Sequence, residues 1–305
     1  MKLIKPSFSI LPQSEGLEGI YKQIELAGRT CYKSEDKITE TSAKEFAVKM
    51  IKLGHGAMLE HGTVYLAIPM TTYAPDAVNT YRDNAYSKVN DCNEFIFTDK
   101  YGDKVAAWCV TTNLRVLVEN DCLEDLEFLC EPTEYHERRV TVKFICDRGV
   151  SHEFVRHRVF SFAQESTRYC NYSKDKFSNE ITYICPCWLD YDKVQKLTEI
   201  ANRDNKEVYR MGHDESLSME ERGLCSFIYD MSNHEHGYLF QVSAGWKAQE
   251  ARAVLPNSLK TELVMTGYIS DWKHFFELRT AGAAHPQARE LALPLKEEFL
   301  TRGYI

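Results

Sequence analysis

The sequence predicts a fold of mixed helices and strands on the basis of three observations. Apolar residues recur at helical spacing in several stretches, such as 17–24 and 46–51, which is typical of amphipathic helices. Other stretches, such as 140–145, alternate in the manner of strands. No Gly-x-Gly-x-x-Gly motif stands between a strand and a helix, which argues against a Rossmann dinucleotide-binding site.

These two patterns place the expected elements in chain order. Each helix is assigned where apolar residues share one face, and each strand where β-branched and aromatic residues dominate. Helices are expected at 17–24, 46–51, 75–84, 113–118, 123–129, 150–156, 191–211, from 218 onward, at 249–255, 271–279 and 288–299. Strands are expected at 64–68, 105–110, 140–145, 169–172, 181–184 and 259–269. The 305 residues are enough for one large domain or two.

Local signals indicate where several of these elements begin and end. Gly28 is expected to end the first helix and Gly54 the second, because glycine readily adopts the left-handed conformation that follows many helices. Ser270 or Asp271 is expected to cap the helix at 271–279. Pro294 is expected to kink the last helix, since proline lacks an amide donor.

Composition and charge argue against several classes of protein. The formal net charge of −8 argues against a surface that coats nucleic acid. No apolar run approaches the length of a membrane span, and the N-terminus lacks the apolar core of a signal peptide. The ten cysteines are therefore interpreted as reduced thiols of a cytoplasmic protein. Cys185 and Cys187 lack a second pair at zinc-like spacing, so no metal is expected.

The segment 156–169 concentrates residue types that bind phosphate and a planar heterocycle. It contains three arginines, a histidine, two serines, a threonine and a glutamine. Arginine presents a rigid set of donors to phosphate oxygens, and hydroxyl groups complete such a site. Gln164 can both donate and accept, as the edge of a pyrimidine requires. A simpler interpretation is a solvated helix end that leads into a loop, where arginine complements the helix dipole.

Arg279 is a second candidate, because it stands on an apolar helix face. Trp272, Phe275 and Phe276 define that face, and Arg279 follows one turn later. An arginine in this position either extends to solvent along its stem or meets an acceptor within the protein. The spacing alone leaves both interpretations open.

Three segments resemble the signature of the flavin-dependent thymidylate synthase (ThyX) family. They are Arg156-His157-Arg158 followed by Ser161, Ser166, Arg168 and Tyr169, then Ala251-Arg252-Ala253-Val254-Leu255-Pro256, and last the helix that ends in Arg279. The glycine-bracketed loop at 54–61 also resembles a family segment, in which His55 and Glu60 match. The first pattern is long and specific, so a chance match is not expected.

The resemblance implies an α+β enzyme with an antiparallel-containing sheet flanked by helices. Residues 1–305 would form a single domain with a folded insertion at about 71–139. The implied reaction is the reductive methylation of dUMP to dTMP. Methylenetetrahydrofolate would supply the carbon, and NADPH would reduce the cofactor FAD, which carries the redox chemistry. The resemblance also implies a homotetramer in which different chains complete each site.

The resemblance also implies roles for individual side chains. Those implied for dUMP binding are Glu153, Arg156, Gln164, Glu165, Ser166, Thr167, Arg168 and Arg252. Those implied for FAD binding are His55, Glu60, Arg156, His157, Arg158, Val159 and His274. The implied catalytic residues are Arg279, which would polarise the uracil ring, and Ser166. Ser166 is expected to bind and activate rather than attack, because the sequence places no histidine or lysine to take its proton.

The sequence departs from the family pattern at several of these positions. Ala57 stands where the family often has threonine, so that flavin contact is absent or replaced. Glu153 stands where the family often has glutamine, and Gln164 where it often has glutamate. This exchange either swaps the partners of the two side chains or removes one contact. His274 replaces an asparagine that some members have.

Two other functions are compatible with parts of the sequence. One is a non-catalytic nucleotide- or RNA-binding protein that uses the arginine-rich loop. The other is a metal-dependent hydrolase that uses His55, His61, His234 and His236. The last two would point about 200° apart on a regular helix, so they could not share one ion.

The sequence contains no indication of what the predicted insertion does. The family core lacks this segment, so deletion of residues 74–137 is expected to leave flavin binding intact.

Overall fold

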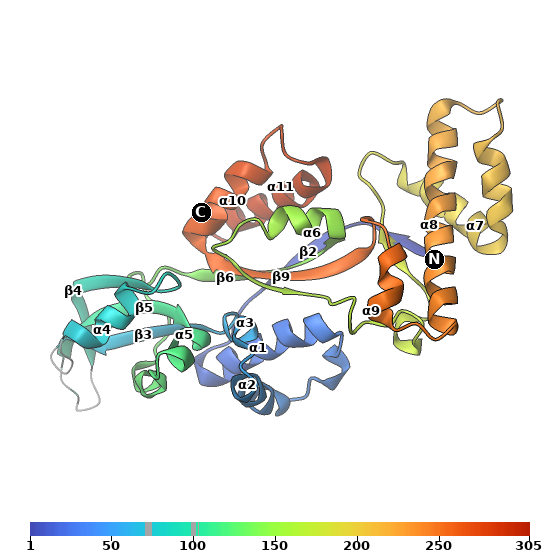
Figure 1. Ribbon diagram of the computed structural model, residues 1–305. Coiled ribbons are helices and arrows are strands. Elements are labelled where there is room, and N and C mark those ends of the chain that lie inside the picture. Colours follow the sequence, from blue (N-terminus) through green and yellow to red (C-terminus); the bar gives the residue numbers. More distant parts are fainter. Residues whose placement is uncertain (71–74, 99–101, 103) are drawn as a thin grey trace.

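The computed structural model describes residues 1–70, 75–98, 102 and 104–305 and has a mixed helix and sheet fold (Figure 1). The α-helices are α1 (Gly16–Tyr32), α2 (Ser42–Lys52), α3 (Gly56–Leu59), α4 (Pro75–Arg82), α5 (Leu114–Glu119), α6 (Arg148–Phe154), α7 (Tyr191–Gly212), α8 (Met219–Ser243), α9 (Ala248–Ala251), α10 (Ile269–Arg279) and α11 (Pro286–Thr301). The strands are β1 (Lys2–Ile4), β2 (Ser7–Leu11), β3 (Thr63–Pro69), β4 (Lys88–Thr98), β5 (Lys104–Asn113), β6 (Arg139–Asp147), β7 (Ser161–Gln164), β8 (Thr182–Ile184) and β9 (Lys260–Tyr268). The 3₁₀ helices are η1 (Glu35–Lys37), η2 (Leu123–Phe128), η3 (Asp175–Phe177) and η4 (Arg252–Val254).

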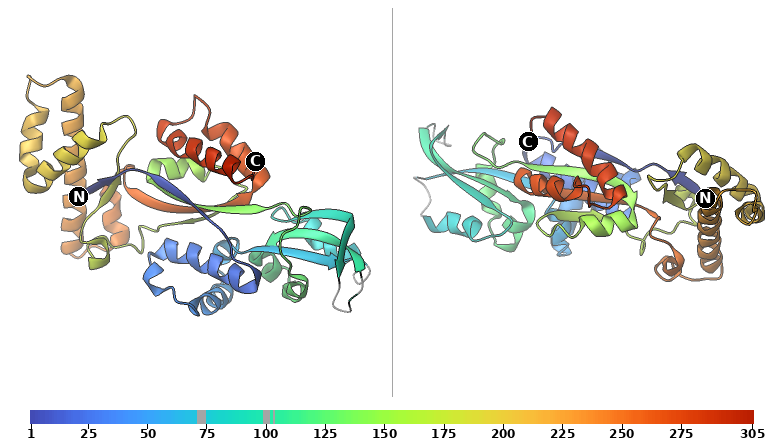
Figure 2. Two further views of the ribbon diagram at one scale, coloured as in Figure 1. Left: turned by 180° about the vertical axis from the view of Figure 1, so that it is seen from behind. Right: turned by 90° about the horizontal axis from the view of Figure 1, so that it is seen from above.

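A four-stranded antiparallel sheet in the order β2-β6-β9-β7 forms the centre of the molecule. β6 and β9 pair from Arg139 opposite Tyr268 to Asp147 opposite Lys260. Helices α6, α10 and α11 cover one face of this sheet, and α1, α2 and α3 lie on the other side (Figures 1 and 2). Because both faces are covered, every residue of β9 after Lys260 is buried.

Aromatic side chains fill the space between the sheet and α6, α10 and α11. The rings of Phe144, Phe154 and Phe275 lie with their centroids between 5.0 and 6.4 Å apart. Trp272 is fully buried and donates its indole N–H to the carbonyl oxygen of Val140 at 3.1 Å. Aromatic pairs of this kind bury large areas with defined geometry. They therefore fix α10 against β6.

Two smaller units lie at opposite ends of the central sheet (Figure 1). At one end, the parallel pair β1–β8 packs with α7 and α8 around a core that includes Tyr183, Val208 and Ile228. At the other end, β3, β5 and β4 form an antiparallel sheet in that order. The two units contribute to two different apolar clusters.

The segment predicted as an insertion is part of a shared core. β5 pairs with β3 along the whole length of β3. One apolar cluster contains Trp108 and Leu117 of the inserted segment together with Ile24 of α1 and Phe46 of α2. Removal of residues 74–137 would separate β3 from this strand and expose the cluster to water. The packing therefore argues against the expectation that flavin binding survives this deletion, because the remaining chain would lose part of its core.

The two glycines predicted to end helices differ in their roles. Gly54 follows α2 with a φ of +65°, as predicted. Gly28 lies inside α1, which continues to Tyr32. A Cβ atom added to Gly28 would lie 2.5 Å from the ring of Phe46. Gly28 therefore allows α1 and α2 to approach closely instead of ending the helix.

Three predictions near the motif segments are wrong. Residues 169–172 form turns instead of a strand, and the amides of residues 169 and 170 donate to the carbonyl oxygen of Ser166. The segment after α6 was expected to be a loop, but it contains β7. Helix α10 has Tyr268 as its N-cap residue, rather than Ser270 or Asp271. The prediction also lacks β1, β2 and β4.

Over the ranges that the structure describes, no helix combines the length and apolar character needed to cross a membrane. The cysteines whose side chains are described are free thiols, including Cys185 and Cys187.

We expect Leu117→Ala to lower the free energy of unfolding of the whole chain by about 2–5 kcal/mol, because it opens a cavity in the shared cluster. Leu117 is fully buried, whereas Leu123, also in the inserted segment, is 41% exposed and provides a control. Leu123→Ala should change the free energy by no more than about 0.5 kcal/mol. Urea unfolding followed by circular dichroism measures both. A separate early transition in Leu117→Ala, with the main transition unchanged, would show that the segment does not share the core.

Candidate functional site

Arg279 at the end of α10 contacts the end of α6 and the residues that follow it. Its Nη1 donates to a carboxylate oxygen of Glu153 at 2.8 Å, and its Nη2 donates to the Glu153 carbonyl oxygen. Its Nε donates to Nε2 of His157 at 2.9 Å. The side chain is only 13% exposed. Of the two interpretations open for this arginine, the structure supports the one in which it meets acceptors within the protein.

These contacts fix the protonation state of His157. Because Arg279 donates to Nε2, that nitrogen carries no proton, and the neutral ring has its proton on Nδ1. Burial, the positive charge of Arg279 and the neighbouring His274 together lower the pKa of His157 to about 4, against the opposing effect of Glu153. The imidazole is therefore neutral at pH 7 and acts as an acceptor beside a fixed guanidinium.

A second group of predicted residues lies at the end of β7, in the loop that follows it and in η4. The amide nitrogen of Gln164 donates to the hydroxyl groups of Ser151, at 2.8 Å, and Thr261, at 3.2 Å. Arg252 of η4 donates to the hydroxyl of Thr167 at 3.1 Å. The Ser166 hydroxyl accepts from the amide of residue 168 at 3.3 Å. The structure thus brings the first two motif segments together through the contact between Thr167 and Arg252.

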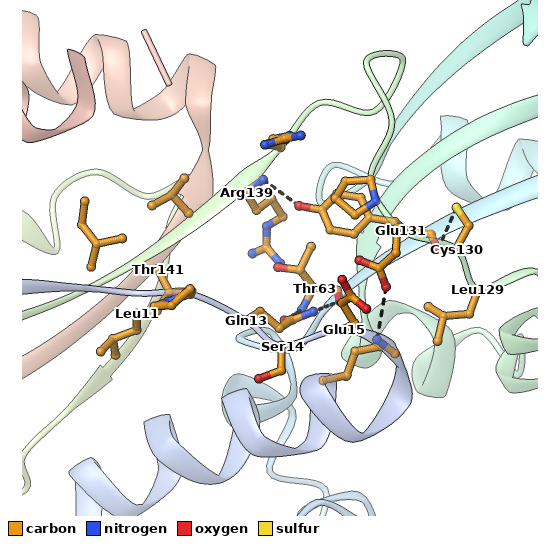
Figure 3. A pocket seen from close by; sticks show the side chains of 18 of the residues that line it. Leu11, Gln13, Ser14, Glu15, Thr63, Leu129, Cys130, Glu131, Arg139 and Thr141 are labelled. Atoms are coloured by element: carbon orange, nitrogen blue, oxygen red, sulfur yellow. Dashed lines mark hydrogen bonds between the residues drawn. The ribbon is translucent and has the colours of Figure 1, made fainter. Parts of the chain in front are cut away.

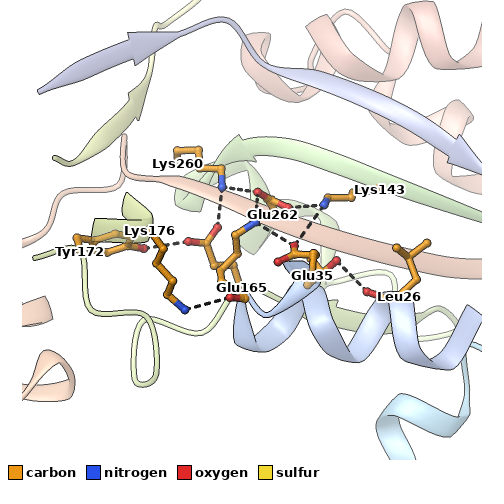
Figure 4. A network of polar contacts seen from close by, with 10 residues as sticks. Leu26, Glu35, Lys143, Glu165, Tyr172, Lys176, Lys260 and Glu262 are labelled. Carbon is orange, nitrogen blue, oxygen red and sulfur yellow. Dashed lines mark hydrogen bonds and ion pairs between the residues drawn. The ribbon is translucent and has the colours of Figure 1, made fainter. Parts of the chain in front are cut away.

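Glu165 is buried beneath this loop and is not free to meet a ligand. Its carboxylate accepts from Lys260 Nζ at 2.9 Å and from the hydroxyl of Tyr172 at 3.3 Å. Its backbone amide donates to the carbonyl oxygen of Glu262 at 2.8 Å. The side chain predicted to bind substrate therefore anchors the loop to β9 (Figure 4).

Glu262 of β9 is the centre of this polar network. Its carboxylate contacts the ammonium groups of Lys33, Lys143 and Lys260, which come from three different elements (Figure 4). The three lysines and the hydrogen bonds that they donate lower the pKa of Glu262 to about 2, against the effect of burial. Glu35 contacts Lys33 at 3.0 Å, which further balances the charge.

Sequence reasoning did not identify this network. The available signal is a charged residue inside an otherwise apolar strand: Lys143 in β6 and Glu262 in β9. A charge that is buried in this way requires a partner. The identity of the partners depends on strand register, which the sequence alone does not reveal.

His55 lines a pocket of about 370 Å³ between the end of α1 and α2. The lining includes five lysine or arginine side chains: Arg29, Lys33, Lys37, Lys49 and Lys176. Asp36 supplies the one carboxylate in the described lining, and Tyr32 and Phe46 supply aromatic surface. On a chain of net charge −8, this concentration of cations suits an anionic ligand.

Glu60, the other matching residue of the glycine-bracketed loop, is held by two arginines. Its carboxylate forms an ion pair with Arg115 of α5, and its carbonyl oxygen accepts from Arg139 at 3.0 Å. The side chain of Glu60 is 12% exposed. The structure therefore shows Glu60 as an internal support of the loop, whereas His55 is exposed.

The other predicted residues lie at the surface of the single chain. The Arg156 side chain is 71% exposed and 3.5 Å from Glu153, so this ion pair contributes little stability. Arg158, Val159, Arg168 and His274 are also exposed. Within the described part of the chain, no hydrogen bond or ion pair joins the Arg279 group directly to the group around Thr167 and Arg252.

A separate pocket of about 180 Å³ lies between the loop before α1, the start of β6 and residues 129–132 (Figure 3). Arg139 and Glu131 are among its lining residues. All the residues predicted to contact ligands are described by the structure, and none of them lines this pocket. It is therefore distinct from the candidate site.

The histidines considered for a metal site do not converge. The buried His61 contacts the hydroxyl of Thr266 through Nδ1 at 2.8 Å, whereas His55 is exposed, and His234 and His236 lie on α8. Among the residues that the structure describes, no three His, Cys, Asp or Glu side chains are grouped closely enough to hold an ion.

Comparisons with known proteins place the motif segments in one family. A family model described as thymidylate synthase complementing protein matches residues 134–302. The chain is 28% identical over 160 residues to the flavin-dependent thymidylate synthase of Pyrococcus furiosus, which covers 52% of this chain and 53% of that protein. It is 32% identical over 153 residues to the flavin-dependent thymidylate synthase of Corynebacterium efficiens. That alignment covers 50% of this chain and 53% of the other protein. The chain therefore spans about half the length of the curated relatives that it matches.

A solved structure of the UMP/dUMP methylase PolB from Streptomyces cacaoi bound with 5-Br dUMP is 13% identical, and the alignment covers 99% of this chain and 93% of that chain. The TM-score of 0.43 is too low to support a conclusion about fold or site.

The depressed pKa of His157 leads to a prediction about acid stability. Unfolded histidine has a pKa of about 6.5, whereas folded His157 has a pKa of about 4. Between these values the unfolded state binds more protons, so the free energy of unfolding falls as pH falls through this window. His157→Gln keeps an acceptor for Arg279 and should show a smaller fall. His236→Gln, on the exposed side of α8, is the control.

Urea unfolding at about pH 7 and about pH 4.5 measures this difference. Equal pH dependence in the wild-type protein and His157→Gln would contradict the assignment. The buried His61, whose pKa is about 3, contributes with the same sign in both proteins and cancels in the comparison.

Proposed function

We propose, from the premise that the chain belongs to the thymidylate synthase complementing protein family, that it is a flavin-dependent thymidylate synthase. The reaction is the reductive methylation of dUMP to dTMP. One observation carries the proposal: Arg279 of the third motif segment bonds to Glu153 and His157, beside the Arg-His-Arg triplet of the first. The relatives that carry the name of this activity match about half of this chain.

We propose FAD as the cofactor, and the residues present fit it. The pocket beside His55 offers a cationic lining for phosphate groups and aromatic surface from Tyr32. Lys37 and Lys49 have no carboxylate partner among the described residues. His157, Arg158 and His274 would contribute further contacts. When bound, the flavin would supply the redox chemistry, with NADPH as reductant and methylenetetrahydrofolate as carbon donor.

Arg279 would act on the uracil ring of dUMP. Its guanidinium is held by three acceptors, so it presents a fixed positive charge that needs no reorganisation. Such a charge stabilises negative charge that develops on the ring during the reaction. The neutral His157 lets the guanidinium remain close without repulsion.

The phosphate and sugar of dUMP would bind to the loop after β7 and to η4. Arg156, Arg168 and Arg252 are exposed and offer charged donors, and Ser166 adds a hydroxyl. Gln164 would lie near the base. Since its amide nitrogen already donates to Ser151 and Thr261, its carbonyl oxygen is the group directed to the ligand.

We propose that a homotetramer completes each site. The exposed arginines have no facing wall within one chain, because Arg156, Arg168 and Arg252 all lie at the surface. A second copy that covers this surface would exclude water and strengthen the charge interactions.

The alternative function, nucleic-acid binding through the arginine-rich loop, is less compatible with the net charge of −8.

The test is a purified full-length protein assayed for dTMP formation from dUMP, methylenetetrahydrofolate and NADPH. We expect an absorbance spectrum of oxidised flavin and turnover that depends on all three substrates. A protein that binds dUMP but has no flavin and forms no dTMP would overturn the proposed activity. Light scattering at the assay concentration reports the oligomeric state.

We expect Arg279→Ala to keep the fold and lower kcat at least about 100-fold, as loss of a fixed donor to a developing anion does in other enzymes. Arg302→Ala is the matched control, because Arg302 pairs with Glu298 on the surface of α11, away from the motif segments. Steady-state kinetics and circular dichroism measure activity and fold. Wild-type turnover by a folded Arg279→Ala variant would reject the role.

A further inference from the structure

The inserted segment contacts both stretches that are proposed to bind the flavin. We propose that its elements β4, β5 and α5 are a positioning device, which fixes the loop at 55–60 and the first turn of α10. The inference rests on the proposed function for the identity of the ligand. The contacts themselves do not depend on it.

The first attachment is made by Arg115 of α5. Its Nη1 forms an ion pair with the Glu60 carboxylate, and its Nε donates to Glu119 on the same helix at 2.7 Å. A Cβ atom at Gly56 would lie 2.8 Å from Arg115 Nε, so the side chain lies directly against the first residue of α3. Arg115 of the inserted segment therefore contacts both ends of the helical turn that follows His55: Gly56 at its start and Glu60 after its end.

The second attachment is made through Tyr268, the residue between β9 and α10. Tyr268 is 6% exposed, and its hydroxyl oxygen lies 2.8 Å from the carbonyl oxygen of Thr111 and 3.0 Å from that of Tyr86, so these two acceptors share its single proton. Both acceptors belong to the inserted segment. A buried carbonyl group that loses its donor incurs a desolvation cost of about 1–3 kcal/mol. The hydroxyl of Tyr268 therefore determines how α10 begins.

A third set of contacts surrounds the N-terminal end of α10. Lys88 of β4 lies 4.8 Å from the centre of the Tyr268 ring and donates to the hydroxyl of Ser270 at 3.1 Å. Lys88 also pairs with Glu137 at 2.8 Å, and Glu137 accepts from the Ser270 hydroxyl. Ser270 and His274 are four residues apart and share one face of α10.

Among the residues that the structure describes, those proposed for dUMP have no such connection to the inserted segment. Gln164 is bonded to Ser151 and Thr261, Ser166 to the end of α1, and Arg252 to Thr167. Loss of the attachments should therefore weaken flavin binding and leave dUMP affinity unchanged. A general loss of stability would instead affect both ligands.

The variants are Arg115→Met and Tyr268→Phe, each in the full-length protein. We expect the dissociation constant for FAD, measured by fluorescence titration of the flavin-free protein, to rise at least about fivefold, which corresponds to about 1 kcal/mol. The dissociation constant for dUMP, measured by calorimetry, should change less than about twofold. Glu119→Gln is the matched control, since it removes the partner of Arg115 on its own helix and leaves Glu60 in place. Arg115→Lys keeps the charge and should restore part of the affinity.

Hydrogen exchange gives a measure that does not require flavin. In Arg115→Met the amides of residues 60 and 61, which bond within the α3 turn, should exchange faster than in Glu119→Gln. Equal exchange and equal FAD affinity in these two variants would overturn the positioning role. A wild-type protein that binds no FAD would overturn the proposed cofactor, while the exchange data would still decide whether the inserted segment fixes the loop.

Discussion

The structure depends on the antiparallel pairing of β6 and β9. Asp147 lies opposite Lys260, and Arg139 lies opposite Tyr268, so the helices that follow the two strands begin at opposite ends of the sheet. Both helices return over the same face (Figure 1). Their C-terminal ends therefore meet, and Arg279 contacts Glu153 and His157 there. A guanidinium at this point also complements the negative poles of both helices.

The opposite face of the sheet carries the polar network centred on Glu262. Three lysines converge on this carboxylate, and Lys260 also holds Glu165. Such a network stabilises a fold only when every member is paired. Here it joins α1, β6 and β9 to the loop that carries Ser166. The loop that carries Ser166 is therefore held by charge pairing. The helix that carries Arg279 is held instead by aromatic packing.

The sequence was sufficient for the family and for the mixed helix and sheet fold, and the family prediction is confirmed. Arg279 could be identified because an arginine on an apolar stripe conflicts with ordinary burial. Glu262 could not be paired with its lysines, because strand register and the end of α1 bring together residues far apart in the chain. Gly28 shows a related difficulty: its spacing suggests a helix stop, but the close approach of Phe46 is the actual constraint. Whether the predicted site residues bind ligands stays a prediction.

The matched family region begins at residue 134, yet it does not form a separate body. β3 and β5 lie outside that region and carry the cluster that includes Leu117 and Phe46. The hydroxyl proton of Tyr268, the residue from which α10 starts, is shared between two carbonyl oxygens of the earlier segment. The geometry of α10 in this chain is therefore determined jointly by both halves. Tyr268 and Ser270 therefore have a structural role in this chain, because their hydroxyl groups contact residues of the earlier segment.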